Sequence, residues 1–586
     1  MFVKLLVALL GLQSRTPLHK TTNIPSSWVK IGKPLSNTTS NFALLLPQAN
    51  VDKLTDIVND RSNPNSPNYG KWLSPFEIDL MIGSNPKDFE VIMDWLHNTV
   101  TGWGCFRTAD SVYCRTTIKN INILFDTEML EYKNSVTNYS FYSGRKKGYS
   151  IPASLQPLIE LVIGIGDFPE YTHRNLKPKN LNDGTYYISP LSITKLYNVS
   201  NYNINSVVGS QSVVEFQNDN CFNLNDLNYF LKDNALQTVN FSKSQLIGEC
   251  DLTTQNPDVE ATLDIQYQLG VNTNTVQEYV SVPDWLYQFA NTLYNLPNPP
   301  LVNSMSYGWA EKDQCDPDVF PECYIGGDAE VYSKRTNIEF LKLALRGVTL
   351  VAASGDAGAA GRTNEMCTDD SPLNPVFPTA SPYVLSVGGT IVMNPTKAKA
   401  STPLCKTNNC VGGGEELNCD FDRCGWTSGG GFSNFFNRPW WQEAASNSYL
   451  NSSAPFPPQK YFNKMGRVYP DIAAVSHNYI IRVMGQYMGV DGTSASSPTI
   501  SAMISQLNNL RLSQNKPSLG LVAPLLYDMF AKCPLCFKDV VEGSNNSTEY
   551  VDCPYGYAAT TGYDAVYGLG LPNFGRMYEY IKNMKN

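Results

Sequence analysis

The chain has 586 residues, with 44 Lys and Arg against 53 Asp and Glu, which gives a formal net charge of −9. At roughly 100 to 200 residues per domain, this length fits a pair of unequal domains. Basic residues interleaved with aromatics do not form a cluster, so the electrostatic footprint of a nucleic-acid-binding protein is missing and an acidic compartment fits better.

Residues 1–14 carry one lysine, Lys4, before a short apolar run, and this pattern predicts a secretory signal peptide. The fourteen cysteines and the N-glycosylation sequons fit the same oxidising route. The sequons begin at Asn37, Asn138, Asn198, Asn240, Asn451, Asn545 and Asn546. No later run approaches the roughly 18 apolar residues of a membrane span, which predicts a protein without one.

From about residue 40 to 165 the sequence mixes short apolar runs with helical stretches such as residues 88–95, and a smaller α+β domain with its linker is expected over residues 15–183. The segment that follows the mixed pattern, residues 171–184, is polar and contains Pro and Lys. Such composition is typical of an exposed linker that proteases cut readily. The domain boundary is therefore expected there, and residues 184–586 form the second domain.

In the second domain, apolar runs at residues 212–216, 301–306, 348–353 and 383–387 alternate with helical patterns. This alternation predicts an α/β fold with a parallel sheet covered by helices on both faces. Residues 329–346 predict a helix that stops at Gly347 and leads directly into a strand at Val348. Ligands of such sheets gather at the carboxyl ends of the strands.

A helix is predicted over residues 256–270, with Asn256 as its cap and Pro257 at its first position. Glu260 and Asp264 lie four residues apart on it, so their carboxyl groups are neighbours. Such a pair is common on a solvated helix face. The functional interpretation is that one carboxyl group takes a proton while the other orients it.

Asp356 follows the predicted strand at residues 348–353, in a loop of small residues at the sheet's carboxyl edge. It is either a turn-forming aspartate or a group that donates a hydrogen bond to the oxyanion of a tetrahedral intermediate. The second role requires acid, because an ionised carboxylate cannot donate. One such donor contributes about 3 to 4 kcal/mol to the transition state.

Four cysteines, Cys405, Cys410, Cys419 and Cys424, lie in a Gly-rich stretch. A zinc site is conceivable, but the spacing does not match the paired CxxC of a zinc ribbon. Local disulfides are favoured, with three connectivities left open. Short disulfide loops are also predicted for Cys315 with Cys323 and for Cys105 with Cys114, two further cysteine pairs close in sequence.

Near the carboxyl end, residues 492–498 read GTSASSP and place Ser494 at the start of a predicted buried helix. A serine hydroxyl is a weak nucleophile that needs a general base. The chain has only four histidines, of which His19, His97 and His173 precede the predicted boundary. His477 lies in a polar turn and is interpreted as a solvated loop residue, so a carboxylate is the better candidate for the base.

Taken together, the GTSASSP segment, the Glu260 and Asp264 pair and Asp356 resemble the sedolisin family of serine-carboxyl peptidases, and within it the tripeptidyl peptidase I branch. The resemblance extends over nearly the whole chain after residue 14. It includes segments to which no catalytic role is given: residues 66–73, 306–308, 377–384, 428–434 and 469–471.

The resemblance implies a subtilisin-like α/β peptidase domain preceded by a ferredoxin-like inhibitory propeptide that is cut off near residues 180–186 on acidification. Ser494 would be the nucleophile, Glu260 the base, Asp264 the group that orients Glu260, and Asp356 the oxyanion donor. A carboxylate base with an ordinary pKa of about 4.3 works best near pH 4 to 5. The expected substrates are peptides with a free N-terminus, from which tripeptides are removed.

The family also holds one calcium ion near the carboxyl end, through two Asp side chains and backbone carbonyls. The matching positions are Asp539, Val540, Thr560, Gly562 and Asp564. Asp539 and Asp564 would supply carboxylate oxygens and the other three would supply carbonyls, which suits a hard cation. By their residues alone these segments also fit a pair of polar loops, and Thr560 stands where relatives have glycine.

Two other functions stay open at this point. The same four residues would serve an acid endopeptidase, and a secreted glycoprotein could keep the fold only for binding. Asp491 and Ala357 stand where relatives usually carry serine, and the Cys405 to Cys424 insertion has no counterpart, which affects substrate preference more than catalysis. The destination is the secretory pathway, ending in the lysosome or outside the cell.

Overall fold

A computed structural model describes residues 14–18, 24, 28–135, 140–166, 178–182, 184–199, 209–216, 221–315, 329–367, 373–399 and 402–584. The predicted signal peptide before Ser14, His19, His173 and Asn138 lie outside these residues. The chain divides into two compact units. Unit 1 comprises Met1–Thr55, Ser74–Thr172 and Lys312–Arg335, and unit 2 comprises Asp56–Leu73, His173–Glu311 and Thr336–Asn586.

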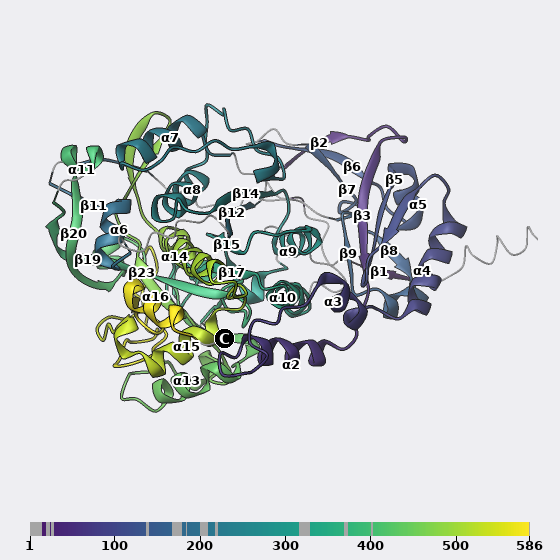
Figure 1. Ribbon diagram of the computed structural model, residues 1–586. Helices are drawn as coiled ribbons and strands as arrows, with labels where there is room; N and C mark the ends of the chain where they lie inside the picture. The colour runs from purple at the N-terminus through teal and green to yellow at the C-terminus, as the bar shows by residue number, and fades with distance from the viewer. Residues whose placement is uncertain are drawn as a thin grey trace, which may run out of the picture. The chain divides into compact units, whose positions relative to one another are not determined.

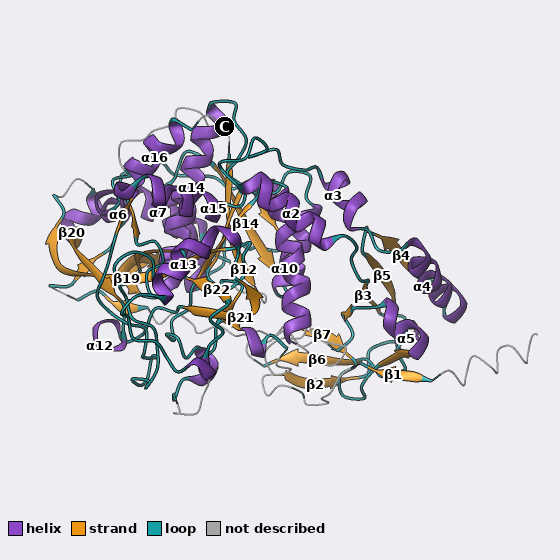
Figure 2. Ribbon diagram, turned by 90° about the horizontal axis from the view of Figure 1, so that it is seen from below, coloured by secondary structure: helices purple, strands orange, loops and turns teal. Residues whose placement is uncertain are grey.

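Unit 1 is built on an antiparallel sheet with the strand order β4-β5-β3-β9. The strands are β3 (Thr39–Leu45), β4 (Gly104–Arg107), β5 (Ser111–Thr117) and β9 (Leu161–Ile163). Two helices lie on one side of it, α4 (Pro86–Thr99) and α5 (Ile118–Leu124) (Figure 2). This order is the ferredoxin-like α+β arrangement that the sequence predicts. Smaller sheets join β2 (Trp28–Gly32), β6 (Leu130–Asn134) and β7 (Ser140–Ser143), and β1 (Arg15–Pro17) with β8 (Ser150–Pro152).

Unit 2 contains a large sheet with the order β11-β20-β19-β17-β15-β12-β14-β13, and β23 pairs with β19. Neighbours from β13 to β19 are parallel, and β19 pairs with β20 in the antiparallel sense. The central strands are β12 (Ser210–Phe216), β14 (Val276–Val282), β15 (Val302–Met305), β17 (Thr349–Ala353), β19 (Leu385–Lys397) and β23 (Ile472–Val475). The four predicted strands are confirmed. The outer strands are β11 (Tyr186–Tyr187), β13 (Leu246–Ile247) and β20 (Asn409–Asn418).

Helices cover the central strands from both sides. Figure 1 shows α8 (Val259–Val271) and α14 (Thr493–Ser513) on one side, and α9 (Leu286–Asn295) and α10 (Ala329–Leu345) on the other. Further helices are α6 (Pro190–Leu196), α7 (Leu224–Asp233), α13 (Glu443–Leu450), α15 (Ala523–Lys532) and α16 (Phe574–Lys582). The sheet covered on both faces is therefore confirmed, with one antiparallel pair that the sequence did not indicate. No helix in the described residues has the length and apolar character needed to cross a membrane.

A segment from the N-terminal part of the chain packs within unit 2. The indole nitrogen of Trp72 donates to the backbone oxygen of Ser518 at 3.1 Å, and the ring occupies the space beside Gly347 and Gly520. Both glycines have positive φ, 78° and 58°, and a Cβ on either would lie within 2.4 Å of the ring. Gly347 thus ends the helix as predicted and also makes room for Trp72.

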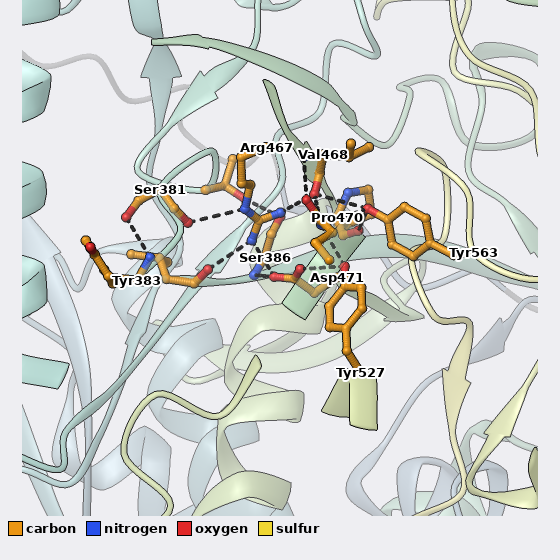
Figure 3. Close-up of polar contacts among 12 residues, drawn as sticks. Ser381, Tyr383, Ser386, Arg467, Val468, Pro470, Asp471, Tyr527 and Tyr563 are labelled. Atoms are coloured by element: carbon orange, nitrogen blue, oxygen red, sulfur yellow. Dashed lines mark hydrogen bonds and ion pairs between the residues drawn. The ribbon is translucent and has the colours of Figure 1, made fainter. Parts of the chain in front are cut away.

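A fully buried ion pair joins two of the segments that carry the family resemblance. Arg467 donates to Asp471 at 2.5 Å and to the backbone oxygens of Ser381 and Val384, while Tyr527 donates to the other carboxylate oxygen of Asp471 at 3.0 Å (Figure 3). The backbone N–H of Ser386 also donates to Asp471, at 2.8 Å. These contacts tie the loop before β19 to the strand β22 (Gly466–Tyr469).

Replacing Arg467 by methionine is expected to lower the free energy of unfolding by about 3 to 5 kcal/mol, because Asp471 stays buried without its cation. Tyr527→Phe removes the hydrogen bond to Asp471 and the one accepted from Gln442, and it serves as the control, with a loss of about 1 to 2 kcal/mol. Urea denaturation of both variants in the full chain measures the difference. A loss below about 1 kcal/mol for Arg467→Met would show that the pair is dispensable.

Candidate active site

The two candidate carboxyl groups lie on α8, a helix buried on all sides. Glu260 is 6% exposed and Asp264 is fully buried, so the solvated-face interpretation is wrong. The predicted cap is also wrong: Asp258 is the N-cap, and its side chain accepts from the backbone N–H groups of Glu260 and Ala261 at 2.7 and 3.1 Å. The helix begins two residues later than predicted because the carboxylate of Asp258 caps two N–H groups at once.

The environment of Asp264 favours its protonated form. Burial first, and then the charge of Glu260, raise the pKa of Asp264 well above its ordinary value. A buried carboxylate loses its hydration, and a second negative charge nearby adds repulsion, so the pair holds a proton more tightly than a solvated carboxyl group would. Two neighbouring carboxyl groups that share a proton can pass it to and from a third group.

The candidate nucleophile lies at the start of α14, as predicted. Ser494 is the second residue of the helix and is 6% exposed, and its hydroxyl makes no hydrogen bond to the described part of the chain. Gly492 precedes the helix with φ 131°, a conformation that residues with a Cβ rarely adopt. Nearly every residue of α14 from Thr493 to Arg511 is buried, which fixes the position of its first turn.

Ser306 connects the two helices. Its hydroxyl oxygen lies 2.6 Å from Oδ2 of Asp264 and 3.2 Å from the backbone oxygen of Ser494. When Asp264 is ionised, the Ser306 hydroxyl donates to its carboxylate, and this contact opposes the rise in the pKa of Asp264 without cancelling it. When Asp264 is protonated, it can donate to Ser306, and the one hydroxyl hydrogen of Ser306 is then free to donate to the backbone oxygen of Ser494.

Asp356 reaches the same place from the sheet. It follows β17, and its Oδ1 accepts from the backbone N–H and the hydroxyl of Thr493 at 2.8 and 2.7 Å. Thr493 also accepts from the backbone N–H of Gly355 at 3.1 Å. The other carboxyl oxygen of Asp356 has no hydrogen-bond partner among the residues that the structure describes, which leaves it available to a ligand beside Ser494.

The structure thus brings three of the four predicted residues together. Asp264 is linked to Ser494 through Ser306, and Asp356 contacts Thr493, the residue before Ser494. Glu260 lies one helical turn from Asp264. Sequence reasoning gave no role to Ser306 or Thr493. Ser306 is the last residue of the predicted strand at residues 301–306, so the sequence places it at the carboxyl edge of the sheet. Residues at this edge often contact a ligand or a catalytic group, which could have identified Ser306 from the sequence. Thr493 precedes the nucleophile and had no signal of its own.

The cysteine-rich segment forms local disulfides, as favoured. Cys405 pairs with Cys410, and Cys419 pairs with Cys424, which settles the open connectivity. The predicted bond between Cys105 and Cys114 is present; Cys315 is also disulfide-bonded, and its expected partner Cys323 lies outside the described residues. Bonds that were not predicted join Cys221 to Cys250, Cys367 to Cys553 and Cys533 to Cys536.

His477 differs from its predicted state. It lies in the turn before β24 (Tyr479–Val483), but its side chain is only 12% exposed and its Nδ1 is 3.0 Å from Oδ1 of Asp491. It also lies close to Cys419 and Cys424, within metal-ligand spacing. Because these two cysteines are bonded to each other, they have no thiolate to offer a metal ion.

The candidate calcium positions come from two adjoining loops. Asp564 is buried, and burial together with the nearby charge of Asp539 raises its pKa to about 7. Asp539 accepts from the backbone N–H of Gly562 at 2.8 Å, and Asp564 accepts from that of Thr560 at 3.0 Å. Two carboxyl groups close enough to interact electrostatically, one of them buried, are a donor set that a hard divalent cation fits.

Comparison with known proteins gives concordant matches over most of the chain. Residues 26–168 match the family described as "Pro-kumamolisin, activation domain". Physarolisin from Physarum polycephalum is 35% identical over 568 residues, which cover 96% of this chain and 97% of the relative. Tripeptidyl-peptidase 1 from Homo sapiens is 29% identical over 600 residues, covering 96% and 94%.

Among solved structures, a Pseudomonas sedolisin (serine-carboxyl proteinase) complexed with two molecules of pseudo-iodotyrostatin aligns with a TM-score of 0.51 at 23% identity. The alignment covers 68% of this chain and 99% of that one. This likeness supports the fold of unit 2, with its parallel sheet and flanking helices.

Two half-buried carboxyl groups on and just after β14 predict that the protein is more stable in acid than at neutral pH. Burial raises the pKa of Glu278 in β14 to about 7 and that of Asp284, just after β14, to about 6. These values exceed the unfolded ones of about 4, so the stabilisation is complete below about pH 4 and is lost as the pH rises through 6 to 7.

Melting of the Ser494→Ala protein, which avoids self-digestion, is expected to show a falling free energy of unfolding between pH 4 and 7. Glu278→Gln should reduce this fall by about 1 kcal/mol, a value discounted for the solvent access of Glu278. The exposed Glu579→Gln is the matched control and should leave it unchanged. A protein that is more stable at pH 7 than at pH 4 would contradict the assignment.

Proposed function

The chain belongs to the sedolisin family of serine-carboxyl peptidases, and from this premise we propose that it removes tripeptides from the free N-termini of peptides and unfolded proteins in acid. The peptidase class rests on the family. Similarity to tripeptidyl-peptidase 1 over 96% of the chain supports the finer activity. The contact that carries the mechanism is the bridge from Asp264 through Ser306 to Ser494.

In the proposed mechanism, Ser494 attacks the scissile carbonyl and Glu260 accepts its proton. Asp264 orients Glu260 and stabilises its charge by sharing a proton. Glu260 then returns the proton to the leaving amine. The roles follow from position: Asp264 is the deeper of the two carboxyl groups, and Ser306 fixes it relative to the helix that carries Ser494.

The oxyanion of the tetrahedral intermediate would be bound by Asp356 and the backbone N–H of Ser494. Asp356 is suited to this because Thr493 holds one carboxyl oxygen and leaves the other available. Its role as a donor requires a proton, which adds a second reason for activity in acid.

The activation domain at residues 26–168 identifies the chain as a precursor. We infer that this part acts as an intramolecular inhibitor and that cleavage falls near residues 180–186. The disulfides agree with passage through the secretory pathway, and delivery to the lysosome or secretion is the proposed destination.

Digestion of synthetic peptides by the acid-treated precursor tests this function. Tripeptides are expected from peptides with a free N-terminus, not from blocked ones, and the rate should rise from pH 7 to pH 4. Ser494→Ala should lose about 10⁴- to 10⁶-fold in kcat. Ser513→Ala, a serine at the exposed end of the same helix, should keep full activity.

Mass spectrometry of the products decides between the alternatives. Internal cuts in blocked peptides would make the protein an endopeptidase of the same family. Full activity in Ser494→Ala would overturn the nucleophile, and no cleavage by the wild-type protein at any pH after propeptide removal would support a binding glycoprotein.

A calcium ion held by Asp539 and Asp564, with the carbonyls of Val540, Thr560 and Gly562, is also proposed. Its role would be to neutralise the two carboxylates and fix the loops beside the β26 (Phe537–Lys538) and β27 (Leu571–Pro572) pair. Because binding to the folded state alone stabilises it, EDTA should lower the melting temperature of the Ser494→Ala protein, and Ca²⁺ should restore it.

Asp564→Asn should remove the effect of EDTA, whereas Asp528→Asn, an aspartate on α15, should preserve it. Restoration by Mg²⁺ as effective as that by Ca²⁺, or no effect of EDTA on the wild-type sequence, would argue against a calcium site.

A further inference from the structure

The linker that precedes the peptidase part of the chain pairs with a strand that leads to the nucleophile. β10 (Lys179–Asn180) is antiparallel to β25 (Gln486–Val490), with Lys179 opposite Gly489 and Asn180 opposite Met488. On its other edge, β25 pairs with β24. The linker therefore uses the free edge of β25 in the way that an added peptide strand would.

The side chain of Lys179 ends on Asp491, which follows β25 directly. The ammonium nitrogen lies 2.6 Å from Oδ2 of Asp491, and the lysine side chain is 61% exposed whereas that of Asp491 is 10% exposed. The contact thus joins an exposed lysine side chain to a carboxylate that is almost buried. The position of Asp491 is therefore set by the surrounding residues and not by Lys179.

Two groups hold Asp491 on its other oxygen. The backbone N–H of Asn478 donates to Oδ1 at 2.6 Å, and Nδ1 of His477 lies 3.0 Å from the same atom. Burial alone would raise the pKa of Asp491, but His477, Asn478 and Lys179 outweigh it and lower the pKa to about 2. Asp491 is therefore ionised in the precursor even in acid, and its Oδ2 faces a cation; His477 and the backbone N–H of Asn478 favour the ionised form independently of Lys179.

The direction of the linker indicates which residues of a bound peptide, those before or those after the scissile bond, would lie along β25. Because the pairing is antiparallel, the linker moves away from Ser494 as it runs from Lys179 to Asn180. A peptide lying in the same direction places the residues after its scissile bond along β25. Lys179, which reaches Asp491, lies opposite Gly489, five residues before Ser494, and five residues span at most about 18 Å, the length of about five extended substrate residues.

We propose that Asp491 is a subsite for a lysine or arginine side chain within the first five residues after the scissile bond, and that Lys179 of the linker occupies this subsite in the precursor. This inference rests on the proposed peptidase function and deepens it. Under tripeptide removal, the preferred substrates carry a basic residue at one of positions four to eight.

Peptides that differ only by Lys or Gln at these positions test the subsite. The acid-processed enzyme is expected to show about a 10-fold higher kcat/KM for Lys at one of them, a size suited to a charged hydrogen bond that is partly open to solvent. Asp491→Asn should bring the ratio to within about 2-fold of one, and added salt should lower it. Glu579→Gln, which removes an exposed acid elsewhere, should keep the preference.

A second experiment does not depend on catalysis. In the full chain with Ser494→Ala, thermolysin cleavage of residues 178–186 at neutral pH is followed by mass spectrometry. Asp491→Asn and Lys179→Gln are each expected to speed this cleavage about 5-fold, because the linker loses its charged contact, and Lys179→Arg should leave it unchanged.

The outcomes distinguish a failure of the Asp491 subsite from a failure of the proposed peptidase function. Equal rates for Lys and Gln peptides, or a Lys preference that persists in Asp491→Asn, overturn the subsite while leaving the peptidase intact. A linker whose cleavage is unaffected by either substitution overturns its occupation by Lys179. Failure of the enzyme to cleave any peptide, with faster linker cleavage in the variants, would reject the proposed function and retain the Lys179 contact.

Discussion

The burial of Glu260 and Asp264 on one helix is the constraint on which the site depends. Two carboxyl groups out of water and next to each other are unstable when both are ionised, so the folded chain must supply a proton or a partner. Here the pKa of Asp264 is raised, and the Ser306 hydroxyl lies 2.6 Å from its Oδ2. Under the proposed mechanism, acid therefore stabilises the arrangement that the chemistry of Ser494 requires, and an acidic pH of activity would follow from the packing of α8.

The parallel sheet brings the rest of the site to this pair. Ser306 follows β15 and Asp356 follows β17, two neighbouring strands whose carboxyl ends meet at one edge. The helix α14 packs across β15 and β17 and lies against α8, so its first turn is held at that edge. Residues separated by more than 200 positions in sequence, such as Asp264 and Ser494, are joined through Ser306 because all three belong to elements of the same layered core.

The sequence predicted the elements better than their contacts. The buried runs at residues 212–216 and 348–353 were strands, since a strand buried on both faces is apolar throughout. The cap of α8 was misplaced because Asn256 and Asp258 are both good caps, and only tertiary packing selects one. Ser306 had no spacing rule that linked it to Asp264, and the cysteine pairs far apart in sequence depended on a fold that periodicity does not encode.

The ionisation of Asp491 and that of Asp264 differ for a physical reason. Both lie near Ser494, yet the pKa of Asp491 falls to about 2 whereas that of Asp264 is raised. Asp491 faces a lysine, an imidazole and a backbone N–H; Asp264 faces another carboxyl group. At one acidic pH the precursor therefore keeps a negative charge on Asp491 and favours a proton on Asp264. Under the subsite proposed above, Lys179 covers Asp491, and a basic side chain of a substrate could bind there only after the linker has left, while the carboxyl pair on α8 stays unchanged.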